Sequence, residues 1–194
     1  MHAPALQERP RFGVEPDGAI EGYASLFGVV DAAHDMVMPG AFATSLKQRG
    51  PRRVPMLFQH NPAEPIGVWL ELREDFRGLY VRGRLIPDVA RAREVLTLIR
   101  EQALDGLSIG FRTVKGRIDP RTRVRRLDVI DLWEISVVTF PLLNGARVQS
   151  VKGLRFSYPR RAQLNEAAAP KESPARTQAE REWRSLMPAL HPSS

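Results

Sequence analysis

The feature that most constrains the fold of this 194-residue chain is a series of short runs in which apolar and polar residues alternate. Alternation is typical of strands, because successive side chains point to opposite faces of a sheet. Turn-forming segments such as Asp75-Phe76-Arg77-Gly78 and Asp119-Pro120-Arg121-Thr122 separate the runs. The runs cover residues 19–27, 54–60, 67–72, 79–86, 107–114 and 124–140. Their spacing predicts a mainly β protein of the α+β class with an antiparallel sheet or barrel.

Two helices are expected to flank the strands. The first follows Pro39-Gly40 and covers residues 41–46, and the second begins at Asp88, a candidate N-cap, and runs to about Gln102. The helical spacing of the second segment predicts core-facing Val95, Leu96 and Ile99 and solvent-facing Arg91, Arg93 and Arg100.

Composition divides the chain into three parts. Residues 1–11 are expected to be a flexible N-terminus, and residues 12–155 to be one folded domain. Hydrophobic residues make up 43% of the chain, which is enough for a core. Residues 156–194 are rich in proline, alanine and charge and predict a tail. Within the tail, helical spacing around Trp183 indicates either a weak docking helix or a disordered end.

The composition also excludes several chemistries. The chain has no cysteine, which rules out disulfides, zinc-thiolate sites and a cysteine nucleophile. No metal or organic cofactor is implied. No apolar segment has the length of a signal peptide or membrane span, so we expect a cytosolic protein without a membrane partner.

The net charge of +7 suggests a polyanionic partner. The basic residues concentrate in residues 112–126, where Asp119 is the local acid. Two interpretations follow: a nucleic-acid-binding module, or a solvated hairpin with charged outer positions. No zinc-finger spacing, helix-turn-helix pattern or aromatic-rich strand pair accompanies the charge, which favours the hairpin.

The sequence Leu104-Asp-Gly-Leu-Ser-Ile-Gly-Phe111 contains the pattern G-x-S-x-G. In α/β-hydrolases this pattern marks a turn between a strand and a helix that exposes a nucleophilic serine. Here a predicted helix precedes the motif and a predicted strand follows it, so the elbow interpretation fails. Ser108 is instead expected inside a strand, on one face with Gly106 and Gly110, while Leu107 and Ile109 face the core. The glycines indicate either a strand crossing or bulge, or a place where a substrate backbone approaches.

A reactive serine needs a base, and the base needs an orienting group. His60 ends the run 54–60 on the same face as Met56 and Phe58, which suits either a general base or a structural histidine. Glu134 interrupts a long apolar run, and alternation places it on a face with Leu132 and Ser136. If that face is buried, Glu134 needs a partner such as a histidine N–H; if exposed, it is an ordinary polar position.

These residues belong to a longer resemblance. The chain resembles the prohead maturation proteases of tailed bacteriophages and prophages, a serine peptidase family related in fold to herpesvirus assemblin. The matching blocks, in order, are GYASLFGVVDAAHDMVMPGAF, VPMLFQHNPAEPIGVW, GLYVRGRL, LDGLSIGF and LWEISVVTFP, between Phe12 and Val148. The resemblance implies an antiparallel β-barrel core of the herpesvirus-protease type.

The resemblance also implies roles for the candidate residues. It assigns His60 as general base, Ser108 as nucleophile and Glu134 as the third member of the triad. Backbone N–H groups at Ile109 and Gly110 are then the expected oxyanion donors.

The implied activity is maturation of the procapsid by an acyl-enzyme mechanism. Expected partners are the major capsid protein with its scaffolding segment, the protease itself in autocleavage, and a further copy in a homo-oligomer. The expected location is the host cytoplasm, inside the assembling procapsid. Two alternatives stay open: a non-catalytic scaffold or capsid-associated protein, and a basic nucleic-acid-binding module.

Overall fold

The computed structural model describes residues 18–151 and 154–155. The predicted N-terminal segment and the tail with Trp183 lie outside the described residues, so the domain boundaries stay predictions. The strands are β1 (Ala19–Leu26), β2 (Asp35–Val37), β3 (Pro55–Phe58), β4 (Asn61–Glu74), β5 (Gly78–Leu85), β6 (Gly106–Ile118), β7 (Arg125–Val138), β8 (Arg147–Val151) and β9 (Leu154–Arg155). The helices are α1 (Ala43–Arg49) and α2 (Ala90–Arg100), and a single 3₁₀ turn covers Pro51–Arg53.

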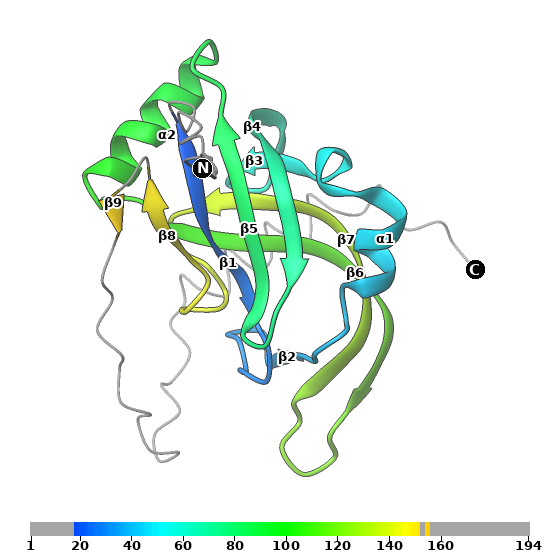
Figure 1. Cartoon of the computed structure of the whole chain (residues 1–194). Helices are drawn as coiled ribbons and strands as arrows, with labels where there is room; N and C mark the ends of the chain where they lie inside the picture. Colours follow the sequence, from blue (N-terminus) through cyan, green and yellow to red (C-terminus); the bar gives the residue numbers. More distant parts are fainter. Residues whose placement is uncertain (1–17, 152–153, 156–194) are drawn as a thin grey trace, which may run out of the picture. The chain divides into compact units, whose positions relative to one another are not determined.

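The strands form a closed barrel in the order β1-β5-β4-β3-β7-β6-β8, and β8 pairs back onto β1 (Figure 1). Most pairings are antiparallel, but β7 pairs in parallel with both β2 and β3. The prediction of an antiparallel barrel is therefore wrong at these two places. The chain travels through β4, β5, α2 and β6 before β7 returns beside β3, and this long crossover brings the two strands together in the same direction.

The predicted strands are found, with three differences. Strand β4 begins at Asn61, directly after a tight turn, and includes residues 61–66, which lie between two of the predicted runs. Strand β6 continues to Ile118 and forms a long hairpin with β7. The barrel is closed by β8, which the alternation did not reveal because the strand is only 5 residues long.

Both helices are present but shifted. Helix α1 begins at Ala43 and α2 begins at Ala90 with Val89 at the N-cap, so Asp88 is not the cap. The predicted core face of α2 is confirmed, because Val95, Leu96 and Ile99 are buried. The helix packs against β4 and β5, and α1 packs against β7 and β4. The largest side chains of the core include Trp69, Phe42, Met56 and Ile66.

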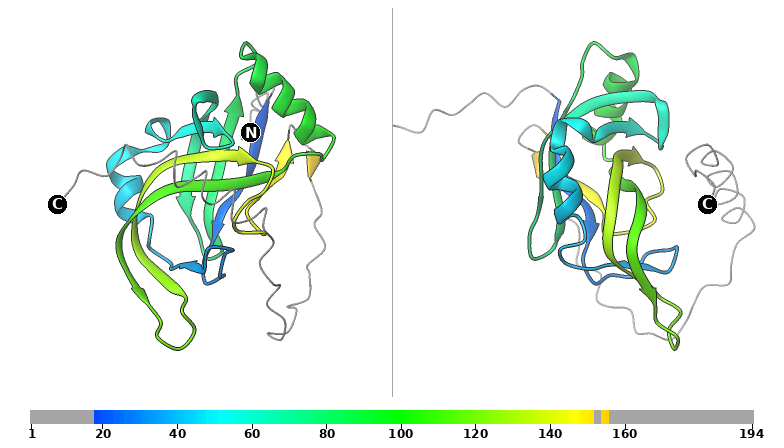
Figure 2. Two further views of the ribbon diagram at one scale, coloured as in Figure 1. Left: turned by 180° about the vertical axis from the view of Figure 1, so that it is seen from behind. Right: turned by 90° about the vertical axis from the view of Figure 1, so that its right-hand side faces the viewer.

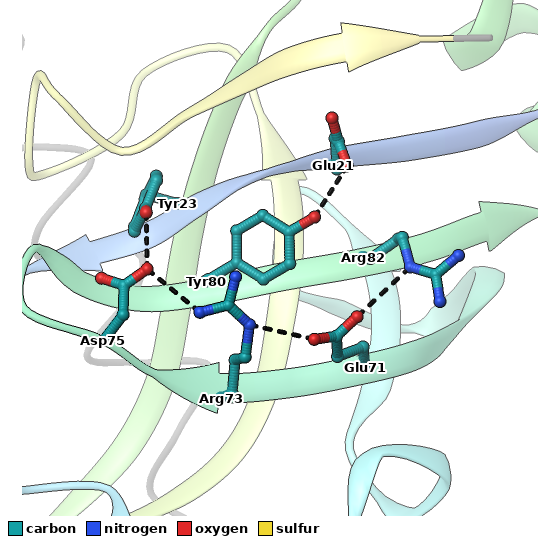
Figure 3. Close-up of polar contacts among 7 residues, drawn as sticks. All are labelled: Glu21, Tyr23, Glu71, Arg73, Asp75, Tyr80 and Arg82. Carbon is teal, nitrogen blue, oxygen red and sulfur yellow. Dashed lines mark hydrogen bonds and ion pairs between the residues drawn. The ribbon is translucent and has the colours of Figure 1, made fainter. Parts of the chain in front are cut away.

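The outer surface of β1, β5 and β4 carries a network of charged and phenolic side chains (Figure 3). Its members are Glu21, Tyr23, Glu71, Arg73, Asp75, Tyr80 and Arg82. The Tyr23 hydroxyl donates to Asp75 Oδ2 at 2.6 Å, and Arg73 Nη1 lies 3.2 Å from the same oxygen. The guanidinium of Arg73 also stacks 4.3 Å from the centre of the Tyr80 ring. These contacts join three neighbouring strands across their solvent face.

Within this network, the carboxylate of Asp75 accepts hydrogen bonds from Tyr23 and Arg73. Burial alone would raise the pKa of Asp75, but hydrogen bonds from Tyr23 and from the backbone N–H groups of Arg77 and Gly78 outweigh it, with Arg73 adding attraction. The pKa of Asp75 therefore lies below its ordinary value. A lowered carboxyl pKa stabilises the folded state above the unfolded-state pKa, and the contribution is lost as pH falls through the folded-state pKa.

We predict that Asp75→Asn lowers the free energy of unfolding by about 1–2 kcal/mol at pH 7, because hydrogen bonds to a charged acceptor are lost. The difference from wild type should begin to shrink as pH falls below about 4, where the carboxylate of the unfolded chain takes up a proton, and it should be lost below the folded-state pKa. Urea unfolding at pH 7 and at pH 3 measures the free energy of unfolding of wild type and variant. Asp88→Asn, at an exposed position, is the control. A difference that stays constant with pH would contradict this role of Asp75.

Candidate active site

His60 occupies a two-residue turn between β3 and β4, in which Phe58 pairs with Asn61. Gln59 and His60 both have positive φ, 53° and 59°, which makes this a hairpin turn of the type normally built from asparagine and glycine. His60 is therefore not the last residue of a strand, as its sequence position suggested. A histidine in the left-handed region is unfavourable on its own, so the turn needs support from neighbouring strands.

Strand β7 supplies that support. The backbone N–H of Gln59 donates to the Val137 carbonyl at 3.0 Å, and the backbone N–H of His60 donates to Ser136 Oγ at 3.2 Å. The Gln59 side-chain amide also donates to Thr139 Oγ1 at 2.6 Å. Three hydrogen bonds thus hold the turn against the C-terminal end of β7. This attachment sets the direction in which the imidazole leaves the backbone.

The imidazole of His60 meets Glu134, 2.6 Å from Nδ1 to Oε1. The second carboxylate oxygen of Glu134 accepts a 2.6 Å hydrogen bond from the Ser136 hydroxyl. A carboxylate only accepts hydrogen bonds, so Nδ1 carries the proton and Nε2 has the free lone pair. Side-chain exposure is 19% for His60 and 9% for Glu134. Glu134 therefore lies on a buried face with the partner that such a position requires.

A β-bulge places Glu134 on this face. Gly110 pairs with Glu134 and Phe111 pairs with Leu132, so Trp133 is an extra residue on β7. The simple alternation that grouped Leu132 with Glu134 is wrong for this reason. Across the bulge Leu132 enters the core, where it is 0% exposed, while Glu134 stays with Ser136 on the opposite face.

Ser108 lies in the interior of β6, directly opposite Ser136 on β7. Opposed residues of an antiparallel pair have side chains on the same face about 5 Å apart at Cβ. Ser108 is therefore on the face that holds Glu134 and the His60 turn. It is 7% exposed, and its hydroxyl has no hydrogen bond to another described residue. Most of this residue is therefore covered by its neighbours.

A small hollow nevertheless reaches Ser108. Its lining is mostly apolar and includes Leu26, Val29, Ile109 and Leu142, with Asp31 and Asp35 as the acidic members. The hollow lies where β6 has passed its pairing with β8, which the structure shows at Gly106. The hollow thus borders the edge of β6 beside the serine.

The two glycines that flank Ser108 have packing partners within the protein. A Cβ at Gly110 would lie 2.2 Å from Glu134 Oε1, and a Cβ at Gly106 would lie 2.3 Å from the Val138 carbonyl oxygen. Gly110 therefore makes room for the carboxylate that contacts His60. The approach of a substrate backbone to these glycines stays a prediction. Contacts with β7 already explain why neither position has room for a Cβ.

The expected oxyanion donors point in different directions. Leu107 N–H donates to the Ala146 carbonyl at 2.9 Å, on the side of β6 away from β7. Ladder hydrogen bonds alternate along a strand, so Ile109 N–H also points away from β7. Gly110 is paired with Glu134, and by the same alternation its N–H points toward β7. Ile109 N–H is therefore the better placed of the two donors.

Ser136 is the residue of this cluster to which the sequence gave no role. It is 0% exposed and joins the Glu134 carboxylate to the His60 backbone. The signal in the sequence was its position two residues from Glu134 in an otherwise apolar run. Arg112, another residue near the motif, extends to solvent and lies 3.6 Å from Asp131 Oδ2.

Comparison with known proteins gives the chain its family. A model of the family described as caudovirus prohead serine protease matches residues 8–157. The prohead protease of Enterobacteria phage HK97 is 38% identical over 140 residues, which cover 71% of this chain and 61% of the relative. The prohead protease of Escherichia phage T5 is 29% identical over 123 residues, covering 63% and 57%. The chain thus spans about three fifths of the length of these curated relatives.

One solved structure agrees with this chain at the level of the fold. The capsid assembly protease of bacteriophage T4 superimposes with a TM-score of 0.52 at 15% identity, over 62% of this chain and 80% of that one. A KSHV protease aligns with a TM-score of 0.45 at 14% identity, over 67% of this chain and 63% of that one.

In the described part of the chain, no helix has the length and apolar character needed to cross a membrane.

The barrel and the His60–Glu134 pair opposite a buried serine define a candidate peptidase site. The chain belongs to the caudovirus prohead serine protease family. The family resemblance inferred from the five sequence blocks is confirmed.

We predict that Gly110→Ala breaks the hydrogen bond between His60 and Glu134, because the new methyl group would occupy the place of Oε1. The proton on Nδ1 is expected to give a downfield ¹H NMR signal in the wild type, and this signal should disappear in Gly110→Ala. Ser108→Ala, two residues away on the same strand, should retain it. An unchanged signal in Gly110→Ala would show that the carboxylate does not depend on the glycine.

Proposed function

We propose that the chain is a serine endopeptidase that matures procapsids by cleaving the scaffolding segment of the major capsid protein, and itself. The main support is the partly buried hydrogen bond between His60 and Glu134 on the face that also holds Ser108, in a chain of this family. The two phage relatives are described as prohead proteases. The place of action is then the assembling procapsid in the host cytoplasm.

The reaction follows from the arrangement of the three side chains. His60 Nε2 accepts the proton of Ser108 Oγ as the oxygen attacks the carbonyl carbon of the scissile peptide. Collapse of the tetrahedral intermediate breaks the C–N bond, and the imidazolium gives its proton to the leaving amine. Water then enters, His60 takes one of its protons, and attack on the ester releases the acid product and restores Ser108. No cofactor is required.

Glu134 and the backbone have distinct tasks in this scheme. Glu134 accepts the Nδ1 proton throughout, which fixes the tautomer and stabilises the imidazolium. Ile109 N–H is the proposed oxyanion donor, because it points to the edge of β6 that borders the hollow at Ser108. Gly110 N–H points toward β7 and is therefore not proposed as an oxyanion donor.

We predict that co-expression of the wild-type chain with the adjacently encoded capsid protein yields a defined N-terminal truncation of the capsid subunit. Ser108→Ala should abolish the truncation while leaving the protein folded, because the hydroxyl is the attacking group. Intact-mass spectrometry of the purified shells measures both. A truncation that persists with Ser108→Ala would favour the alternative of a non-catalytic, capsid-associated protein.

Ser136 is proposed as a positioning residue for this reaction. We predict that Ser136→Ala lowers kcat/KM on the capsid protein by about 10²-fold, because small displacements of catalytic groups are costly. The matched control is Ser45→Ala, which removes another buried hydroxyl that accepts a backbone N–H, 2.9 Å from Leu132 N. Both variants should lower the free energy of unfolding by about 1–2 kcal/mol. Equal kcat/KM for the two variants would contradict the role of Ser136.

A further inference from the structure

The hairpin formed by β6 and β7 extends beyond the barrel. Figures 1 and 2 show its distal part projecting beyond the barrel, with the turn at its end, and the short strand β2 pairs with β7 in this part. Beyond Phe111 the side chains of β6 become predominantly exposed, whereas residues 106–108 of the same strand are buried. The hairpin therefore combines, on the same two strands, Ser108 and Glu134 at one end and a solvated ribbon at the other.

The distal part of the hairpin, residues 112–126, is called the ribbon below. It carries several cations that have no ion-pair partner among the described residues. Lys115, Arg117, Arg121 and Arg123 are all exposed, and none forms an ion pair with another described residue. The acid among them, Asp119, is used in the turn, where Oδ1 accepts the backbone N–H groups of Arg121 and Thr122. Such a concentration of cations is self-repelling, so it suits a negatively charged partner.

Arg125 follows the turn at the distal end of the hairpin, where it pairs with Ile118, and its guanidinium is already in an ion pair. Arg125 forms two hydrogen bonds with the Asp35 carboxylate, one of them 2.7 Å from Nε to Oδ1. Its backbone N–H also donates to the His34 carbonyl at 2.8 Å. These contacts attach the distal end of β7 to β2 and the loop before it. The free cations are therefore presented on a supported ribbon and not on an unattached loop.

The surroundings of these cations favour a polypeptide over a nucleic acid. Val114 is 60% exposed and Ile118 is 55% exposed, and both lie on β6 among the cations. Apolar side chains beside arginine are typical of protein interfaces. Residues 112–126 contain no aromatic side chain on which a base would stack.

Strand β6 also fixes the distance from the cations to the serine. Ser108 and Arg117 are about nine residues apart along one continuous strand, which corresponds to about 30 Å. A bound segment that reaches both positions must therefore extend about nine or more residues from the scissile bond. Contacts at that distance change binding of a long substrate without touching the reacting atoms.

We propose that the distal hairpin is an exosite that binds an acidic segment of the protein substrate, remote from the bond that is cut. This inference rests on the proposed function, since the substrate is the capsid protein with its scaffolding segment. The exosite selects and concentrates the substrate through charge and apolar contact, while Ser108, His60 and Glu134 perform the reaction.

The test is a triple charge reversal, Arg117→Glu/Arg121→Glu/Arg123→Glu, in the full chain. The expected result is a rise of at least about tenfold in KM for the capsid protein with kcat within twofold, because the contacts are lost equally in ground and transition states. Raising the salt concentration from about 50 to 300 mM should raise KM more for the wild type than for the variant. The matched control, Lys47→Glu/Arg52→Glu/Arg53→Glu, makes the same change in net charge at exposed residues elsewhere and should leave KM within twofold.

Two further measurements separate the exosite from the reaction itself. In a Ser108→Ala background, the affinity for uncleaved capsid protein should fall by the same factor in the hairpin variant, and this readout needs no catalysis. The rate at which a small fluorophosphonate labels Ser108 should be equal in wild type, hairpin variant and control, because this probe does not reach the hairpin. A polyglutamate peptide of 20 residues should inhibit capsid cleavage by the wild type, and a glycine-serine peptide of equal length should not.

Several results would overturn the exosite. Normal labelling of Ser108 with unchanged KM and unchanged capsid binding in the hairpin variant would refute it and leave the proposed function standing. Retention on a DNA duplex that is lost in the hairpin variant, with KM unchanged, would instead assign the ribbon to nucleic acid. A wild type that neither labels at Ser108 nor cleaves would refute the proposed function, but loss of capsid binding in the variant would still support an acidic docking segment.

Discussion

The carboxylate of Glu134 is the group on which the arrangement of this site depends. A charged side chain with so little exposure is costly unless its oxygens are paired, and here both are, one with His60 and one with Ser136. Three local departures from regular structure serve this pairing. The bulge at Trp133 turns Glu134 to the correct face, the glycine at position 110 leaves space for it, and the strained turn at Gln59-His60 brings the imidazole to it.

The parallel pairing of β3 with β7 makes this geometry possible. It places the end of β3 beside Ser136, so that the turn after Phe58 is fixed to the same strand that holds Glu134. The proposed base and acid are thus attached to one strand, and Ser108 is on the strand next to it. An entirely antiparallel barrel would run β3 in the opposite direction, and the same turn would then leave from the other end of the strand.

Much of the fold follows from alternation, and the deviations have identifiable causes. Periodicity found the long strands and the buried face of α2, because each has several repeats of its pattern. Periodicity missed β8, because that strand is short. It also placed Leu132 and Glu134 on the same face, because a bulge reverses the alternation of faces and no residue type identifies a bulge in the sequence. The positive φ of His60 was equally hidden, since histidine is not a residue that predicts such a turn. His60, Ser108 and Glu134 were proposed from chemistry and family resemblance, whereas only the structure shows that the Ser136 hydroxyl joins His60 and Glu134.

The central claim is that His60 and Glu134 activate Ser108. The most direct measurement is the rate and position of covalent labelling by a fluorophosphonate, mapped by peptide mass spectrometry in wild type, His60→Gln and Glu134→Gln. The account predicts labelling at Ser108 in the wild type and a rate at least about 10²-fold slower in both variants. Labelling at a different residue, or labelling of Ser108 at the wild-type rate in either variant, would contradict it.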